Sequence, residues 1–262
     1  MDEQHVDLRG HGLTSVPAEV LAQRGLRSLA LGRNPGLRIP DEIGDLTTLE
    51  ALYLDEMELD AVPEWIGRLE GLRVLDLGHN RLASLPAGVE RLRALEVLYI
   101  SDNRLAELPA QVRPLRALTH LGATDNEIAE LPAWIGELDA LIELRLYRNT
   151  LTGLPASIGA VRSLRELHLH DNRMVTLPAT IGELAQLRHL DLRKNRVAEL
   201  PATLGGLGRL RVLDLRQNRL TTLPDALGDL PALEKLDLRW NGFLDPPPPA
   251  ERLRARGCVV LV

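Results

Sequence analysis

Apolar and polar positions alternate along this chain at a constant interval. From Leu72 the sequence reads LRVLDLGHNRLASLPAGVERLRA, and from Leu187 it reads LRHLDLRKNRVAELPATLGGLGR. In each stretch the segment LDL sends two leucines to one face of an extended segment and the aspartate to the other. The proline that follows has no backbone N–H for a strand ladder, so the chain has to return. The pattern predicts one short strand and one short helical or extended return per repeat.

A period of 23 residues runs through the sequence of 262 residues. Prolines recur at that interval from Pro17 to Pro247, and no insertion or deletion interrupts the register. Every asparagine falls in one phase of the same period, whereas Met57 and His11 occupy that phase in other repeats. Such a period indicates a repeat architecture in which neighbouring coils stack and share one interior. The asparagines are Asn34, Asn80, Asn103, Asn126, Asn149, Asn172, Asn195, Asn218 and Asn241.

The asparagine of each repeat is predicted to be buried, because its amide has a donor and an acceptor for backbone groups that turn away from water. Met57 therefore marks a coil that differs locally. A glycine such as Gly67 recurs where a helical turn would end, which favours a positive φ. Glu90 and Arg113 stand in that place in two repeats. We expect the turns of those two repeats to differ.

The consensus LxxLxLxxNxLxxLPxxIGxLxx resembles the leucine-rich repeat family, and within it the 23-residue subclass of Ras-scaffold, Ras-suppressor, plant Ras-group-related and bacterial repeat proteins. The resemblance covers essentially the whole chain. It implies an α/β repeat fold, a horseshoe-shaped solenoid with a parallel sheet on the concave face and short helical or extended turns on the convex face. It also implies a non-catalytic protein-interaction module or scaffold. The first partners that it suggests are a small Ras-like GTPase, its regulators or a phosphatase scaffold.

The chain is expected to form one solenoid domain with a cap at each end. Residues 1–25 keep the period but are more polar, residues 26–245 hold the repeats, and residues 246–262 form the second cap. After a run of four prolines the sequence predicts a short helix and a last strand. In that strand Val259 and Leu261 fall in the core phase of the repeat, so Cys258, Val260 and Val262 are predicted to face the inner surface.

The residues that vary from repeat to repeat on the exposed strand face are the candidates for recognition. All three tyrosines of the chain lie on this face, and tyrosine is favoured in binding patches. The small residue Gly122 predicts a notch for one anchor side chain of a partner. The alternative is that these residues only cover the leucines beneath them. The predicted partner-binding residues are Tyr53, Asp55, Glu56, Asp76, Tyr99, Ser101, His120, Gly122, Thr124, Arg145, Tyr147, His168, His170 and Trp240.

Trp240 belongs to a second candidate surface at the C-terminal edge. Together with the last strand it would form an apolar patch whose open edge could pair with another copy of the chain. Simple capping is the preferred interpretation, because the strand is short and terminal. We therefore expect a monomer.

The charge balance bears on the partner. The chain has 31 Lys and Arg against 37 Asp and Glu, a formal charge of -6, which argues against a general nucleic-acid binder. Asp191 and Arg193 begin neighbouring acidic and basic columns that should neutralise each other. Acidic residues dominate the N-terminal half and would steer a basic partner there. They are Asp55, Glu56, Glu58, Asp76, Asp102 and Asp125.

Catalysis and metal binding receive little support from the sequence. No motif of a hydrolase, a metalloprotease or a nucleotide-binding loop is present, so we expect no enzyme and no cofactor. His168 and His170 share one strand face, with His189 and Asp191 on the next coil, which would permit a metal site. Strand alternation alone places them there, and we therefore predict no metal.

The sequence also bears on location and source. It has no apolar run long enough for a membrane span and no signal-peptide pattern, and its single cysteine, Cys258, permits no internal disulfide. We expect a cytoplasmic protein. Arg outnumbers Lys 29 to 2, which hints at a bacterial source. The alternative function is the recognition part of a secreted bacterial effector of the ubiquitin-ligase type, weakened because no catalytic cysteine domain is present.

Overall fold

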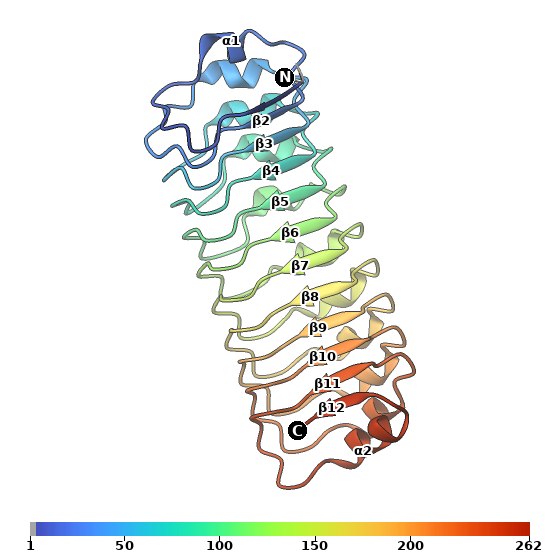
Figure 1. The fold of residues 1–262 in the computed structure, drawn as a ribbon. Helices are drawn as coiled ribbons and strands as arrows, with labels where there is room; N and C mark the ends of the chain where they lie inside the picture. Colours follow the sequence, from blue (N-terminus) through green and yellow to red (C-terminus); the bar gives the residue numbers. More distant parts are fainter. Residues whose placement is uncertain (1–3) are drawn as a thin grey trace. The chain divides into compact units, whose positions relative to one another are not determined.

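The computed structural model describes residues 4–262, which divide into two compact units at residue 126, so that the described part of the first unit is residues 4–126 and the second unit is residues 127–262. In each unit short parallel strands form a sheet, and short helices lie on the return side of the coils (Figure 1). The N-terminal cap predicted at residues 1–25 belongs to the first unit, and residues 1–3 of it lie outside the described residues. The division into caps and repeats within a single domain stays a prediction.

The first unit contains the first six strands, which pair in chain order. The register keeps equivalent residues of successive repeats side by side, as Leu52, Leu75 and Leu98 show. The strands are β1 (His5–Asp7), β2 (Ser28–Ala30), β3 (Ala51–Tyr53), β4 (Val74–Asp76), β5 (Val97–Tyr99) and β6 (His120–Gly122). The return segments hold α1 (Ala18–Leu21) and the 3-10 helices η1 (Asp41–Asp45), η2 (Glu64–Arg68), η3 (Ala87–Arg91) and η4 (Ala110–Val112).

The second unit repeats this arrangement and ends in a longer helix. Its strands also pair in chain order, parallel and in register. They are β7 (Glu143–Arg145), β8 (Glu166–His168), β9 (His189–Asp191), β10 (Val212–Asp214), β11 (Lys235–Asp237) and β12 (Val259–Leu261). The helices are η5 (Ala133–Glu137), η6 (Ala156–Ala160), η7 (Ala179–Glu183), η8 (Ala202–Gly206), η9 (Asp225–Asp229) and α2 (Pro248–Ala255).

The predicted alternation of the strands is confirmed. Leu75 and Leu77 are fully buried, whereas Asp76 between them is half-buried on the other face. Each return begins at a proline in extended conformation, such as Pro86, whose carbonyl accepts a hydrogen bond from the Val89 amide at 3.2 Å. Leucines of strand and return thus share one interior, which supplies most of the stabilising burial.

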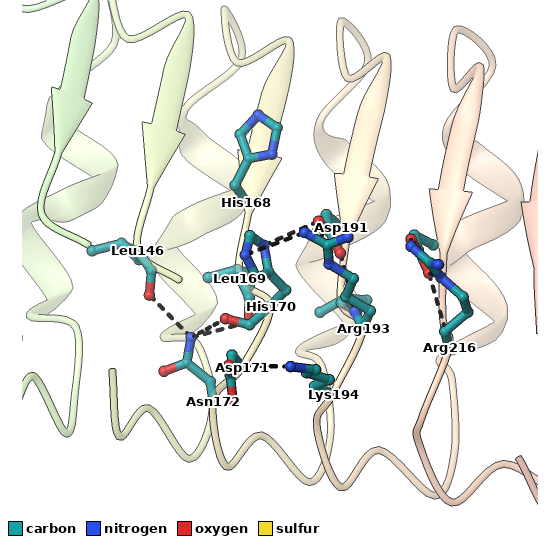
Figure 2. A network of polar contacts seen from close by, with 12 residues as sticks. Leu146, His168, Leu169, His170, Asp171, Asn172, Asp191, Arg193, Lys194 and Arg216 are labelled. Carbon is teal, nitrogen blue, oxygen red and sulfur yellow. Dashed lines mark hydrogen bonds and ion pairs between the residues drawn. The ribbon is translucent and has the colours of Figure 1, made fainter. Parts of the chain in front are cut away.

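The buried asparagine ladder is confirmed for seven of the nine asparagines, whereas Asn103 and Asn241 are half-buried. Figure 2 shows one buried member. The Asn172 amide nitrogen donates to the carbonyls of Leu146 and Leu169, each at 3.0 Å. Its side-chain oxygen accepts the Leu151 backbone N–H at 3.0 Å. One side chain therefore closes a turn and joins two neighbouring coils. At the Met57 position the side chain is buried and apolar, and its backbone N–H donates to the Asn80 oxygen.

The residue before each asparagine adopts the left-handed conformation, although it is not glycine. Asp171 has a φ of 59° and Lys194 a φ of 55°. This conformation costs an ordinary residue about 1 kcal/mol or more. The Asn172 side chain donates to the carbonyls of Leu169 and His170, which helps to hold the turn closed. Glu56 adopts the same conformation before Met57, with a φ of 53°.

The prediction that the recurring glycines adopt a positive φ is wrong. Gly67 and Gly136 have negative φ, and they are glycine because the helical turns of successive coils approach too closely for a side chain. A Cβ on Gly67 would lie 2.7 Å from the Gly88 carbonyl oxygen. The turn with Arg113 is shorter, as expected, whereas the turn with Glu90 keeps the usual five residues.

The C-terminal cap contains the predicted helix and strand, but the two faces of the strand are the reverse of the prediction. Val260 pairs with Leu236 and is buried, and Cys258 is buried too. Val259 is instead 56% exposed. The reason is that helix α2 adds one residue to this coil, and a shift of one residue exchanges the two faces of a strand.

Candidate binding surface

Two tyrosines and an aspartate lie side by side on the exposed face of the first unit's sheet. Tyr53 of β3 is in register with Asp76 of β4, and Asp76 is in register with Tyr99 of β5. All three side chains are half-buried. Neighbouring strands lie about 4.8 Å apart, so the Asp76 position lies between two tyrosine positions. These residue types can bind a cationic side chain, because aromatic faces and carboxylates both attract positive charge.

The carboxylate of Asp76 is held in an unfavourable electrostatic environment. Burial raises its pKa above the ordinary value, and the nearby Asp55 carboxylate raises it further. The Gly78 backbone N–H, which donates to Asp76 Oδ1 at 2.9 Å, lowers the pKa but does not reverse the shift. Asp76 is therefore a charged group that a cation from a partner would stabilise.

At one end of this surface Tyr53 already contacts a cation. The Arg9 guanidinium carbon lies 5.8 Å from the centroid of the Tyr53 ring. Arg9 also binds Asp7 through both carboxylate oxygens, and these hydrogen bonds lower the pKa of Asp7 to about 2. The contact shows that the face of Tyr53 is open to a guanidinium group.

The other acidic residues predicted for this half are largely neutralised by neighbours. Glu56, at the turn after β3, accepts a hydrogen bond from Arg33 at 3.1 Å. Glu58 pairs with Arg81 at 2.8 Å, and Asp102 lies 2.7 Å from His79. Asp76 differs from these residues, because Arg9 and His79 lower its pKa only in part and the pKa stays raised.

At Gly122, where the sequence predicts a notch, the structure describes the neighbours on the side of β5. The Tyr99 ring covers this glycine, and a Cβ on Gly122 would lie 2.8 Å from Tyr99 Cδ1. Thr124 is also buried, and its backbone N–H donates to the Ser101 hydroxyl at 3.2 Å. His120 is half-buried and lies 2.9 Å from the Thr119 hydroxyl. The small residue thus leaves room for the Tyr99 ring on this side, and the notch as a binding site stays a prediction.

The second unit brings its predicted residues together on its own sheet face. The rings of Tyr147 and His170 stack, with centroids 4.2 Å apart and planes 11° apart. Arg145 is exposed and pairs with Glu143. His168 lies 3.1 Å from Glu166 and 3.6 Å from Glu143. The two glutamates escaped the sequence analysis, although their position two residues before Arg145 and His168 places them on the same strand face.

Buried carboxylates of the second unit are compensated within the chain (Figure 2). Asp191 lies 3.0 Å from His170 Nδ1 and 3.4 Å from Arg193 Nε. Burial alone would raise the pKa of Asp191, but hydrogen bonds from His170 and the Arg193 backbone outweigh it and lower the pKa. Arg216 in turn lies between Asp214 and Asp237. The predicted mutual neutralisation of the acidic and basic columns is confirmed.

Trp240 is the remaining predicted residue, and it is 65% exposed. The Arg239 guanidinium carbon lies 5.2 Å from the centroid of its ring. Trp240 occupies the left-handed position before Asn241, with a φ of 60°. Its side chain is accordingly accessible at a turn.

Comparison with known proteins identifies the class. The model of the leucine-rich repeat region family matches residues 63–155 and 155–245, which is most of the chain. The chain belongs to the leucine-rich repeat family. No curated protein sequence matches it significantly.

Solved structures share this fold. A plant peptide hormone receptor, RGFR1 in complex with RGF2, is 28% identical with a TM-score of 0.75, and the match covers 87% of this chain and 38% of the receptor. A TDR receptor is 28% identical with a TM-score of 0.81 over 94% of this chain and 44% of the receptor. A leucine-rich repeat protein of Leptospira interrogans is 24% identical with a TM-score of 0.51, and the match covers 100% of this chain and 96% of that protein. The chain thus spans less than half the length of the two receptor chains.

None of the helices in residues 4–262 combines the length and the apolar character of a membrane span.

Proposed function

We propose that this chain is a non-catalytic protein-interaction module that binds a partner through the exposed faces of its sheets. The observation that carries the proposal is the row Tyr53, Asp76 and Tyr99, where a half-buried carboxylate with a raised pKa is flanked by a tyrosine on each neighbouring strand. A structural role alone would not favour a destabilised charge at this place.

The chemistry of this row defines the kind of partner. A lysine or arginine of the partner would neutralise Asp76 and contact the tyrosine rings. Such a contact combines a charge-assisted hydrogen bond with a cation–π interaction. Asp55 adds negative charge beside it, which favours encounter with a basic surface. The leucine-rich repeat fold supports this interpretation, because a receptor similar to this chain was solved in complex with RGF2.

The finer assignments are also proposals. The resemblance stated above suggests a small Ras-like GTPase or one of its regulators, in a signalling pathway of the cytoplasm, and a bacterial source. The alternative, the recognition part of a bacterial effector, would use the same surface. A longer natural gene product with a catalytic cysteine domain would favour this alternative.

Partner capture from the source organism tests the proposal. The captured protein is purified, and its affinity is measured by calorimetry against the wild type and against a triple variant, Tyr53→Ala, Asp76→Asn and Tyr99→Ala. We expect the triple variant to bind at least about 100-fold more weakly, since central aromatic and charged contacts carry most of the binding energy.

The matched control removes a carboxylate elsewhere on the same unit. Glu107 is exposed and lies outside the strands, so Glu107→Gln should leave the affinity unchanged. Equal affinity of the triple variant and the wild type, with thermal unfolding intact in both, would reject the first face as the binding surface.

A further inference from the structure

Four side chains of types that can bind a metal ion occupy neighbouring positions on the outward face of β8 and β9. Glu166 and His168 alternate along β8, and His189 and Asp191 alternate along β9. The parallel register sets Glu166 beside His189 and His168 beside Asp191. Successive exposed positions on two paired strands therefore carry two imidazoles and two carboxylates.

Three of these side chains converge. One ligand atom each of His168, His189 and Asp191 lies within 4.8 Å of the others. The two imidazole rings have centroids 4.9 Å apart and are tilted by 58°, so they do not stack flat against each other. Zinc accepts imidazole nitrogen and carboxylate oxygen at about 2.0–2.2 Å. Small rotations of the three side chains would bring their ligand atoms around one ion.

Neighbouring side chains orient two of the three ligands. Asp191 is buried and is oriented by His170 Nδ1 at 3.0 Å and by Arg193. His168 is oriented by Glu166 at 3.1 Å. Neighbours of this kind orient metal ligands in known sites.

We propose that His168, His189 and Asp191 bind one divalent transition-metal ion of the zinc type. Two imidazoles and one carboxylate suit zinc, cobalt or nickel better than calcium or magnesium, which prefer oxygen ligands. Three protein ligands leave a coordination position open on the exposed face. A water molecule or a side chain of a partner would complete the coordination there. The site extends the proposed function and does not depend on it.

Cobalt and zinc are the probes for this site. The chain is freed of metal with a chelator, and Co²⁺ binding is followed by visible absorption while Zn²⁺ binding is followed by calorimetry. We expect one equivalent of either ion to bind, with cobalt absorption typical of nitrogen and oxygen ligands. His189→Ala and His189→Gln should each weaken binding at least about tenfold.

The control is a histidine–carboxylate pair in the other unit. His79 lies 2.7 Å from Asp102 and is exposed, so His79→Ala should leave metal binding unchanged. Wild-type binding no tighter than that of the His189 variants would overturn the proposal. Loss of binding in Glu143→Gln with unchanged binding in His189→Ala would also overturn it, because the ion would then occupy Glu143, Glu166 and His168, the other converging group. Thermal unfolding of every variant verifies that it is folded.

Discussion

The exposed sheet faces of the two units share the same backbone arrangement, but the pKa values of their carboxylates shift in opposite directions. In the first unit Asp76 is half-buried beside a second carboxylate, and its pKa is raised. In the second unit Asp191 and Asp237 are more deeply buried, yet their pKa values are lowered by histidine and arginine neighbours. The fold leaves these positions free to vary, because the interior carries the stability. A face whose carboxylate keeps a raised pKa is the better candidate for partner binding.

The interior common to both units should show the largest effect on stability. Asn80→Ala and Asn172→Ala each leave several buried backbone groups without a partner, at about 1–3 kcal/mol per group. We expect each variant to lose about 3 kcal/mol of the free energy of unfolding. Urea unfolding measures it. A loss confined to one of the two would contradict the view that the interiors are equivalent.

Breaking the charge compensation of the second face should destabilise the protein next most strongly. Arg216→Ala removes the hydrogen bonds to Asp214 and the ion pair at 3.4 Å with the buried Asp237. We expect a loss of about 1–2 kcal/mol, since solvent screens part of the guanidinium. Arg209→Ala, at an exposed position outside the strands, is the control. An unchanged free energy of unfolding for Arg216→Ala would show that pairing of Arg216 with Asp214 and Asp237 does not stabilise the protein.

Removing the charge of Asp76 on the first face should stabilise the protein. Asp76→Asn keeps an oxygen that can accept the Gly78 N–H and removes the negative charge beside Asp55. We expect Tm at pH 7 to rise by up to about 4 °C, which corresponds to about 1 kcal/mol for a chain of this size. Differential scanning calorimetry measures it. Asp60→Asn, exposed outside the strands, controls for general loss of negative charge.

The gain from Asp76→Asn should depend on pH in a defined direction. The folded protein binds the Asp76 proton more tightly than the unfolded chain does, because the folded pKa is raised. The wild type therefore loses stability as pH rises from the ordinary carboxyl pKa through the folded pKa, and the loss is complete above it. The gain should accordingly vanish at the acid end. A stability gain of Asp76→Asn that grows toward low pH would contradict the raised pKa of Asp76.

The smallest effect is expected for the exposed ion pair of the first unit. Arg9 and Asp7 have side chains that are 46% and 57% exposed, although their oxygens and nitrogens approach to 2.6 Å. Arg9→Ala should change the free energy of unfolding by less than about 0.5 kcal/mol. Chemical denaturation in low salt gives the measurement. If Arg9→Ala lowered the free energy of unfolding as much as Arg216→Ala, the exposure of an ion pair would not determine how much it stabilises the protein.

The repeat fold followed from the sequence because its signals recur at a fixed interval. The phase of the asparagines predicted the buried ladder, and the alternation around Asp76 predicted its face. The role of Gly67 could not be read this way, because it depends on how closely the next coil packs. The face of Val260 was missed for a similar reason, since helix α2 adds a residue that no local pattern marks. The position of the Tyr99 ring against Gly122 was not predicted either, because it depends on how a side chain of the neighbouring strand packs.

Side-chain carboxyl titration by NMR tests the contrast between the two faces most directly. The account predicts that the pKa of Asp76 lies above the ordinary value near 3.8 and that those of Asp191 and Asp237 lie below it. Values for Asp76 at or below those of Asp191 and Asp237 would contradict it.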